Sequence, residues 1–254
     1  MRVLDLFSGI GGFSLGLERA GMTTAAFCEI DPFCRKVLKK HWPSIPCYED
    51  ITKLTAEQLK QDGIEVDLIC GGFPCQDISI ANQNGKGLHG ERSGLWHEYA
   101  RLIGEVRPRY IIIENVTNLT RRGLADILRD LASLGYDAEW HCIPASALGA
   151  AHRRDRVWII ACPDSLGRSG RDRESPIFEQ SLGAYIKKGC SLWPETSVRI
   201  ANHIRHPETA PDYLRSDYGL SDWVHRIRAL GNAVVPQIPK IIGKVIMEAE
   251  NEQN

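Results

Sequence analysis

Apolar residues along this chain gather in short runs, and segments with helical spacing separate them. Runs at residues 2–7, 23–30, 66–69, 110–113 and 157–161 are short and rich in β-branched residues, which predicts buried strands. Residues 136–143 form a further predicted strand, and a short one is expected just before Asp50. Helical periodicity marks residues 13–21, 32–41, 55–61, 95–106, 126–134 and 239–250. This alternation predicts an α/β domain.

The periodicity fades after residue 163, where Gly, Ser, Pro, Arg and Asp dominate until about residue 222. We interpret this composition shift as a second, smaller unit. The predicted organisation is a first domain at 1–162, a small loop-rich domain at 163–225, and a C-terminal segment at 226–254 that contains the last predicted helix.

The amino-acid composition excludes few classes of protein. The net charge of −1 gives no support for wholesale nucleic-acid binding, so any such binding needs a local basic surface. The eight cysteines contain no Cys-x-x-Cys pair, which indicates reduced thiols in a cytoplasmic protein rather than disulfides or a metal site. We expect no membrane span, because no apolar run is long enough.

Glycines and an acid near the N-terminus predict an adenosine site. The turn Ser8–Gly12 joins a predicted strand to a helix, and Glu29 ends the next strand. Glycines let main-chain N–H groups approach a ligand, and the acid can accept hydrogen bonds from ribose hydroxyls. The next glycine, Gly16, lies inside the helix, so the spacing is not Gly-x-Gly-x-x-Gly and disfavours a nicotinamide cofactor.

Three kinds of reactive side chain lie at further strand ends. Cys75 follows Pro74 where the chain leaves the strand at 66–69, and Glu114 follows the strand at 110–113. Arg154 and Arg156 precede the strand at 157–161, and alternation would put them on one face. Cys75 alone could be a small buried hydrophobe, and the arginines could be solvated charges. The polar stretch 76–94 is either a functional loop or a plain surface loop.

Taken together, these motifs closely resemble the DNA cytosine-C5 methyltransferases. The matching stretches are DLFSGIGGF at 5–13, GFPCQ at 72–76, ENV at 114–116, RDR at 154–156 and GNAVVP at 231–236, in the family's order. The resemblance implies a Rossmann-like S-adenosylmethionine-dependent methyltransferase fold with a mixed sheet. It implies that residues 1–162 form the catalytic and cofactor-binding domain, that 163–225 form a small target-recognition domain, and that the helix in 226–254 packs back on the catalytic domain. It also implies that S-adenosylmethionine methylates C5 of a cytosine swung out of a specific duplex DNA sequence.

The resemblance also implies a role for each matching residue. Cys75 would add to C6 of the base, Glu114 would hydrogen-bond the base, and Arg154 and Arg156 would act on Glu114, the base or the thiolate electrostatically. Glu29 would bind the ribose, Ile30 would pack on the adenine, and Asp50 would accept from the adenine amino group, with Ile51 beside it. The rest of the cofactor pocket would comprise Phe7, Gly9, Ile10, Gly12, Pro74, Leu95 and Asn232. DNA contacts are expected at Gln76, Ser79, Arg168, Arg171 and Arg173, although solvated charges are an equal alternative for these arginines.

The chain departs from the family in two places. Ala151 and His152 replace the usual Pro-Gln before the arginines, and we expect His152 to substitute as a hydrogen-bonding residue. The segment before Gly231 is short for a target-recognition region. Two other functions stay open: methylation of tRNA by the same chemistry, and a cofactor-binding regulator that grips DNA without catalysis. We expect a monomer, with a cognate restriction endonuclease as an optional partner.

Overall fold

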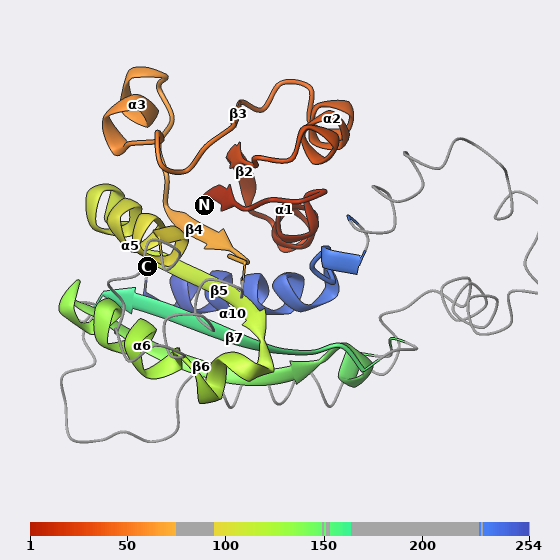
Figure 1. Ribbon diagram of the computed structural model, residues 1–254, viewed down its shortest axis with the longest axis vertical. Helices are drawn as coiled ribbons and strands as arrows, with labels where there is room; N and C mark the ends of the chain where they lie inside the picture. Colours follow the sequence, from red (N-terminus) through yellow and green to blue (C-terminus); the bar gives the residue numbers. More distant parts are fainter. Residues whose placement is uncertain (75–93, 149, 151–152, 164–228, 230, 254) are drawn as a thin grey trace, which may run out of the picture.

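The computed structural model describes residues 1–74, 94–148, 150, 153–163, 229 and 231–253. In this part of the chain, strands and helices alternate along the sequence, as predicted (Figure 1). The strands are β1 (Arg2–Leu6), β2 (Thr23–Cys28), β3 (Cys47–Tyr48), β4 (Leu68–Gly71), β5 (Tyr110–Val116), β6 (Tyr136–Pro144) and β7 (Asp155–Pro163). The helices are α1 (Gly12–Glu18), α2 (Pro32–His41), α3 (Ala56–Gln61), α5 (Gly94–Val106), α6 (Leu124–Ser133) and α10 (Gln237–Gln253), with 3₁₀ turns η1 (Thr117–Arg121) and η2 (Ala145–Leu148).

The strands form one mixed sheet in the order β3-β2-β1-β4-β5-β7-β6. The first five in this order pair in parallel, whereas β7 runs antiparallel to both β5 and β6. The carboxyl ends of β1, β2, β4 and β5 therefore reach the same edge of the sheet. The antiparallel β7 brings its beginning to that edge, since Arg156 pairs with Val116 near the end of β5.

Alternate residues of each central strand belong to two different cores, one on each face of the sheet. Leu4, Ile69, Ile111 and Ile159 join the core under α3, α5 and α6. Their strand neighbours, such as Val3, Ile112 and Trp158, join the core under α1 and α10. The strands are thus apolar on both sides, which is why the sequence shows continuous apolar runs rather than a polar alternation.

The last helix packs against the first, as the sequence predicted, and small residues permit the approach (Figure 1). A Cβ placed on Gly16 would lie 2.4 Å from the carbonyl oxygen of Pro236, and one on Gly243 would lie 2.9 Å from Cβ of Ala20. The described backbone at these positions leaves no room for a side chain. Gly16 is therefore a packing residue of the α1–α10 interface.

Several boundaries differ from the prediction. β2 ends at Cys28 rather than at residue 30, because Glu29 turns back to accept hydrogen bonds from main-chain N–H groups. α3 begins at Ala56, with the Thr55 hydroxyl accepting from N of Gln58 as its N-cap. No helix in the described part of the chain has the length and apolar character needed to cross a membrane. The predicted small domain at 163–225 lies almost wholly outside the described residues.

Candidate active site

The turn between β1 and α1 is held in left-handed backbone conformations. Phe7, Gly9 and Gly11 have φ values of 52°, 53° and 85°. Such angles cost an ordinary residue about 1 kcal/mol or more but suit glycine, so Phe7 is the strained member of the turn. The Ser8 hydroxyl donates to the carbonyl of Asp5 at 2.6 Å and fixes the turn from within. A Cβ on Gly9 would meet no atom within 4 Å, so this point of the turn is open.

The buried side chain of Asp5 holds this turn in place. Asp5 is fully buried, and its Oδ2 accepts hydrogen bonds from N and Oγ of Ser14 at 3.2 and 2.8 Å. Burial raises the pKa of Asp5 to about 8, although the Ser14 hydrogen bonds act in the opposite direction. The first turn of α1 is thereby fastened to β1.

Glu29 and Ile30 follow β2; the first has a buried carboxyl group and the second an exposed apolar side chain. The buried Glu29 carboxylate accepts from N of Gly9 at 2.7 Å and from N of Asp31 at 2.8 Å. Ile30 is 72% exposed, unusual for a large apolar side chain. Arg35 on α2 holds this corner, because its Nη1 donates to the carbonyls of Glu29 and Ile30 at 3.2 and 2.8 Å. The structure thus joins two predicted site residues, Gly9 and Glu29, by a direct hydrogen bond.

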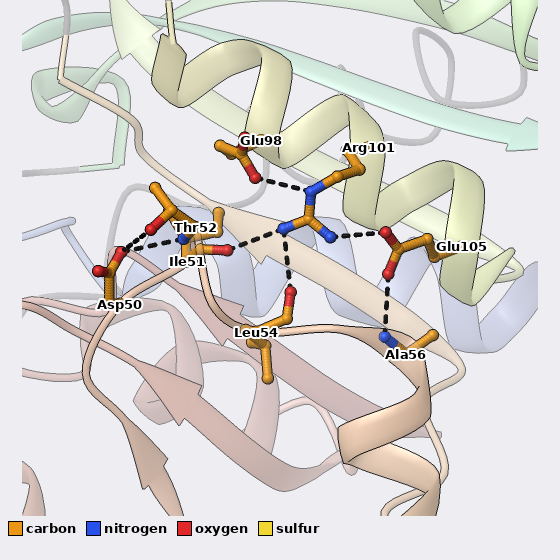
Figure 2. A network of polar contacts seen from close by, with 8 residues as sticks. All are labelled: Asp50, Ile51, Thr52, Leu54, Ala56, Glu98, Arg101 and Glu105. Atoms are coloured by element: carbon orange, nitrogen blue, oxygen red, sulfur yellow. Dashed lines mark hydrogen bonds and ion pairs between the residues drawn. The ribbon is translucent and has the colours of Figure 1, made fainter.

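Asp50 and Ile51 follow β3 in a turn of their own. Oδ1 of Asp50 accepts from N and Oγ1 of Thr52 at 3.0 and 2.8 Å, and these hydrogen bonds lower the pKa of Asp50 (Figure 2). Ile51 is buried in the core under α5. An exposed apolar side chain and carboxyl oxygens on neighbouring strand ends fit an adenosine, which needs a surface for its base and acceptors for its hydroxyl and amino groups.

Four further predicted pocket residues lie in different parts of the described structure. Pro74 and Asn232 are exposed, and Leu95 packs against the core under α5. Gly12 lies at the start of α1, where a Cβ would come within 2.5 Å of the carbonyl of Val234. Gly12 therefore has a packing role, and a shared pocket for these residues stays a prediction.

At the end of β5, Glu114 is buried and paired. Nε of Arg156 lies 2.8 Å from Oε1 of Glu114, and the two side chains are only 21% and 11% exposed. Burial raises the pKa of Glu114, while the charges of Arg156 and Arg154 oppose the rise. A Cβ on Gly72 would lie 2.7 Å from Oε2 of Glu114, so a side chain at this position would displace the carboxyl group. The carboxyl group thus lies against the stretch that leads to Cys75.

Asn115 fixes the chain just before Cys75. Its Nδ2 donates to the carbonyl of Phe73 at 3.0 Å, and its Oδ1 accepts from N of Val116 at 2.8 Å. The buried Phe73 ring also packs on Trp96, with 5.6 Å between the ring centroids. Sequence reasoning gave Asn115 no role of its own. The one signal was its position in the ENV motif.

The two arginines of the RDR motif have different contacts. Arg154 precedes β7 with φ of 38°, and its Nη1 and Nη2 donate to the carbonyls of Gly231 and Ala233 at 2.6 and 2.7 Å. Arg156, by contrast, pairs with Glu114. Simple strand alternation does not apply to Arg154, because β7 begins at Asp155. Arg154 therefore attaches the GNAVVP segment to the sheet, and its charge still acts on Glu114.

Several predicted residues lie outside the described part of the chain. These are Cys75, Gln76, Ser79, His152, Arg168, Arg171 and Arg173. Their roles stay predictions.

Comparison with known proteins identifies the family of this chain. The family model for C-5 cytosine-specific DNA methylases matches residues 1–213, and the chain belongs to that family. Type II methyltransferase M2.BsuMI of Bacillus subtilis is 37% identical over 169 residues, covering 63% of this chain and 42% of the relative. M.Sau3AI of Staphylococcus aureus is 34% identical, covering 70% and 47%. The chain thus spans less than half the length of these two relatives.

One further relative and two solved structures match this chain over other fractions of its length. Type II methyltransferase M.AquIA of Picosynechococcus is 28% identical over 85% of this chain and 98% of the relative. A solved prophage-encoded protein (E. coli), provisionally assigned as a DNA modification methyltransferase, has a TM-score of 0.55 at 32% identity over 65% of this chain and 47% of its own. The Dnmt2 methyltransferase of S. pombe, at 23% identity and a TM-score of 0.54, covers 72% and 55% and supports the fold alone. The predicted Rossmann-like methyltransferase fold is confirmed.

Proposed function

We propose that this chain is a DNA (cytosine-5-)-methyltransferase that acts on a flipped-out cytosine in a specific duplex DNA sequence. The observation that carries the proposal is the buried Glu114, paired with Arg156 and lying against Gly72, three residues before Cys75. A regulator that only bound DNA would have no need to bury a paired carboxyl group beside the stretch that leads to Cys75.

Cys75 would supply the nucleophile. C5 of cytosine is a poor nucleophile, and a thiolate that adds to C6 turns the ring into an enamine with electron density at C5. Once C5 carries the methyl group, loss of the C5 proton and departure of the Cys75 sulfur restore the aromatic ring. Positive charge nearby favours the thiolate form of a cysteine, and Arg154 and Arg156 supply such charge at this edge.

Glu114 would hold the base and promote the addition. Because burial raises the pKa of Glu114, its carboxyl group holds a proton more readily than an ordinary glutamate and can donate it in a hydrogen bond to N3 of cytosine. The other carboxyl oxygen can accept from the exocyclic amino group. Arg156 would fix the orientation of the carboxyl group through the 2.8 Å contact.

The turns after β1, β2 and β3 would bind the cofactor. Glu29 would accept from the ribose hydroxyls, Ile30 would pack on the adenine, and Asp50 would accept from the adenine amino group. When bound, S-adenosylmethionine would supply the electrophilic methyl group. The remaining pocket residues would be Phe7, Gly9, Ile10, Gly12, Ile51, Pro74, Leu95 and Asn232.

Duplex DNA would be the macromolecular substrate, and residues 163–225 would select its sequence. Extrusion of the base costs a few kcal/mol, which phosphate and base contacts in this region and at Gln76 and Ser79 would offset. The relatives named as Type II methyltransferases support a place in restriction and modification, with a cognate endonuclease as partner. We propose that the chain acts in the cytoplasm as a monomer.

The test is methyl transfer by the purified chain to duplex DNA, with bisulfite sequencing to locate the modified base. Cys75→Ser should abolish transfer, whereas Cys142→Ser, a change at an exposed cysteine on β6, should leave it within twofold. Duplex DNA containing 5-fluorocytosine should trap a covalent adduct with the unaltered chain only. Full activity in Cys75→Ser, or transfer to tRNA and not to DNA in a parallel assay, would refute the proposal.

A further inference from the structure

One arginine on α5 contacts both its own helix and a distant loop (Figure 2). Nε of Arg101 donates to Oε2 of Glu98 at 2.7 Å, and Nη1 donates to Oε1 of Glu105 at 2.6 Å. Nη2 donates to the carbonyl oxygens of Ile51 and Leu54, each at 2.9 Å. The guanidinium group thus uses all three of its nitrogens, and half of its contacts reach the loop between β3 and α3.

The same network fastens the far end of that loop. The second oxygen of Glu105 accepts from N of Ala56, the first residue of α3, at 3.0 Å. Hydrogen bonds from Arg101 and Ala56 lower the pKa of Glu105 against the opposing effect of its burial, so the carboxylate stays charged. Residues 51–56 are therefore held to α5 at three main-chain points: the carbonyls of residues 51 and 54 and the N–H of residue 56.

This loop carries the proposed adenine contacts. Asp50 and Ile51 lie at its start, and Leu95, another proposed pocket residue, lies on the same helix as Arg101. Arg101 binds only main-chain atoms of the loop, so it fixes the backbone and leaves the Asp50 side chain available. Resting on the proposed function, we propose that Arg101 is a positioning residue that sets the Asp50–Ile51 turn against α5 and thereby determines adenine affinity.

Lysine cannot replace arginine in this role. The guanidinium group is a planar fork with five N–H donors in fixed directions, whereas an ammonium group has three donors on a single atom. One ammonium group cannot reach two carboxylates and two carbonyl oxygens in the arrangement observed. Arg101→Lys would keep the charge beside Glu98 and Glu105 but lose the carbonyl contacts. It therefore separates the positioning role from simple charge balance.

The experiment measures binding of S-adenosylhomocysteine and of adenosine by isothermal titration calorimetry. Arg101→Met and Arg101→Lys should each raise the Kd for both probes about tenfold. In steady-state assays with duplex DNA, both variants should raise the KM for S-adenosylmethionine and leave kcat within about twofold. Thermal unfolding of each variant without ligand shows whether the protein is folded, and Arg101→Lys keeps the test available if Arg101→Met does not fold.

Arg129→Met is the matched control, because Arg129 forms an exposed ion pair with Asp126 on α6 and contacts no proposed pocket residue. It should leave both Kd values within twofold. Folded Arg101 variants that bind both probes as tightly as the unaltered chain would overturn the inference while leaving the proposed function intact. If the unaltered chain itself binds neither probe, the proposed function fails and the inference fails with it.

Discussion

The carboxyl-end edge of the sheet has two halves that hold their acids in opposite ways. In the half formed by β1, β2 and β3, Glu29 and Asp50 are held by main-chain N–H groups and, for Asp50, a hydroxyl. In the half formed by β4, β5 and β7, Glu114 is buried against Gly72 and paired with Arg156. The first arrangement lowers the pKa of Asp50, and the second raises the pKa of Glu114.

This difference matches two chemical tasks. An acid that accepts hydrogen bonds from hydroxyl or amino groups works best ionised, and hydrogen-bond donors keep it so. An acid that must donate to a ring nitrogen needs to hold its proton more readily than an ordinary carboxyl group, and burial favours this. The same residue type therefore serves as acceptor in one half and as donor in the other. Substitutions at Glu114, Arg156 and Asp50 test this division, and the largest effect is expected at Glu114.

Replacing Glu114 should abolish most of the activity. Glu114→Gln keeps the shape but loses the acidic proton, so we expect kcat to fall by about 10³-fold. The Kd for S-adenosylhomocysteine should stay within twofold, because the change affects only the base-binding half. Rapid-quench measurement of methyl transfer, together with calorimetric binding, checks both values. An equal loss of cofactor affinity would show that the two halves are not independent.

Removing the partner of Glu114 should cost stability and shift the pH profile. Arg156→Met leaves a buried carboxyl group unpaired, and we expect unfolding free energy at neutral pH to fall by about 2 kcal/mol. Without the cation the pKa of Glu114 rises further, so the protonated form persists to higher pH. The alkaline limb of kcat/KM for DNA should therefore move to higher pH. Arg153→Met, which removes an exposed ion pair with Asp155, should change neither quantity.

Replacing Asp50 should weaken only cofactor binding. In Asp50→Asn, the amide oxygen can still accept from Thr52. The second oxygen is replaced by an NH2 group, which donates hydrogen bonds and cannot accept one from an adenine amino group. We expect about a tenfold rise in the Kd for adenosine, which is about 1.4 kcal/mol. Asp62→Asn is the control, because Asp62 is also exposed and hydrogen-bonded but lies outside the proposed pocket. Unchanged affinity would remove Asp50 from the site.

Asp5 should have a pH-dependent effect on stability. Its pKa is about 8 in the folded chain against 3.8 for the ordinary group, so the folded state holds a proton that the unfolded state releases. Its contribution to stability should therefore fall by about 1.4 kcal/mol per pH unit between pH 5 and 7. Asp5→Asn removes this slope. Urea unfolding at pH 5.5, 6.5 and 7.5 measures the free energy of unfolding of both proteins. The stability of Asp5→Asn relative to the unaltered chain should rise with pH, and an equal pH dependence of the two would contradict the raised pKa of Asp5.

Those features of the fold and the site that depend on local sequence patterns and on residues at the ends of strands could be predicted. The α/β class was predicted because apolar runs and helical spacing carry that signal locally, whereas the mixed sheet and the packing of the last helix on the first were implied only by the family resemblance. The approach of Glu114 to the Gly72 stretch follows from the parallel pairing of β4 and β5. The expectation that Arg156 acts on Glu114 also agrees with the observed ion pair.

Contacts that join distant main-chain atoms could not be predicted in this way. Arg101 has Glu98 and Glu105 three positions before it and four after it, a pattern typical of solvated ion pairs on a helix surface. Nothing in that pattern reveals the carbonyls of Ile51 and Leu54. The attachment of Arg154 to Gly231 and Ala233 was hidden for the same reason, since a carbonyl oxygen carries no sequence signal.

The close fit of α10 on α1 has a consequence for how the chain is made. Val3, Phe13 and Leu17 share a core with Ile242, Val245 and Ile246, which come from the other end of the sequence. On the ribosome, that face of the sheet stays uncovered until the final helix emerges. Such long-range closure is slow, and a growing chain with an open apolar face is prone to aggregation. Newly synthesised molecules should therefore depend on chaperones until α10 has left the ribosome and packed on α1.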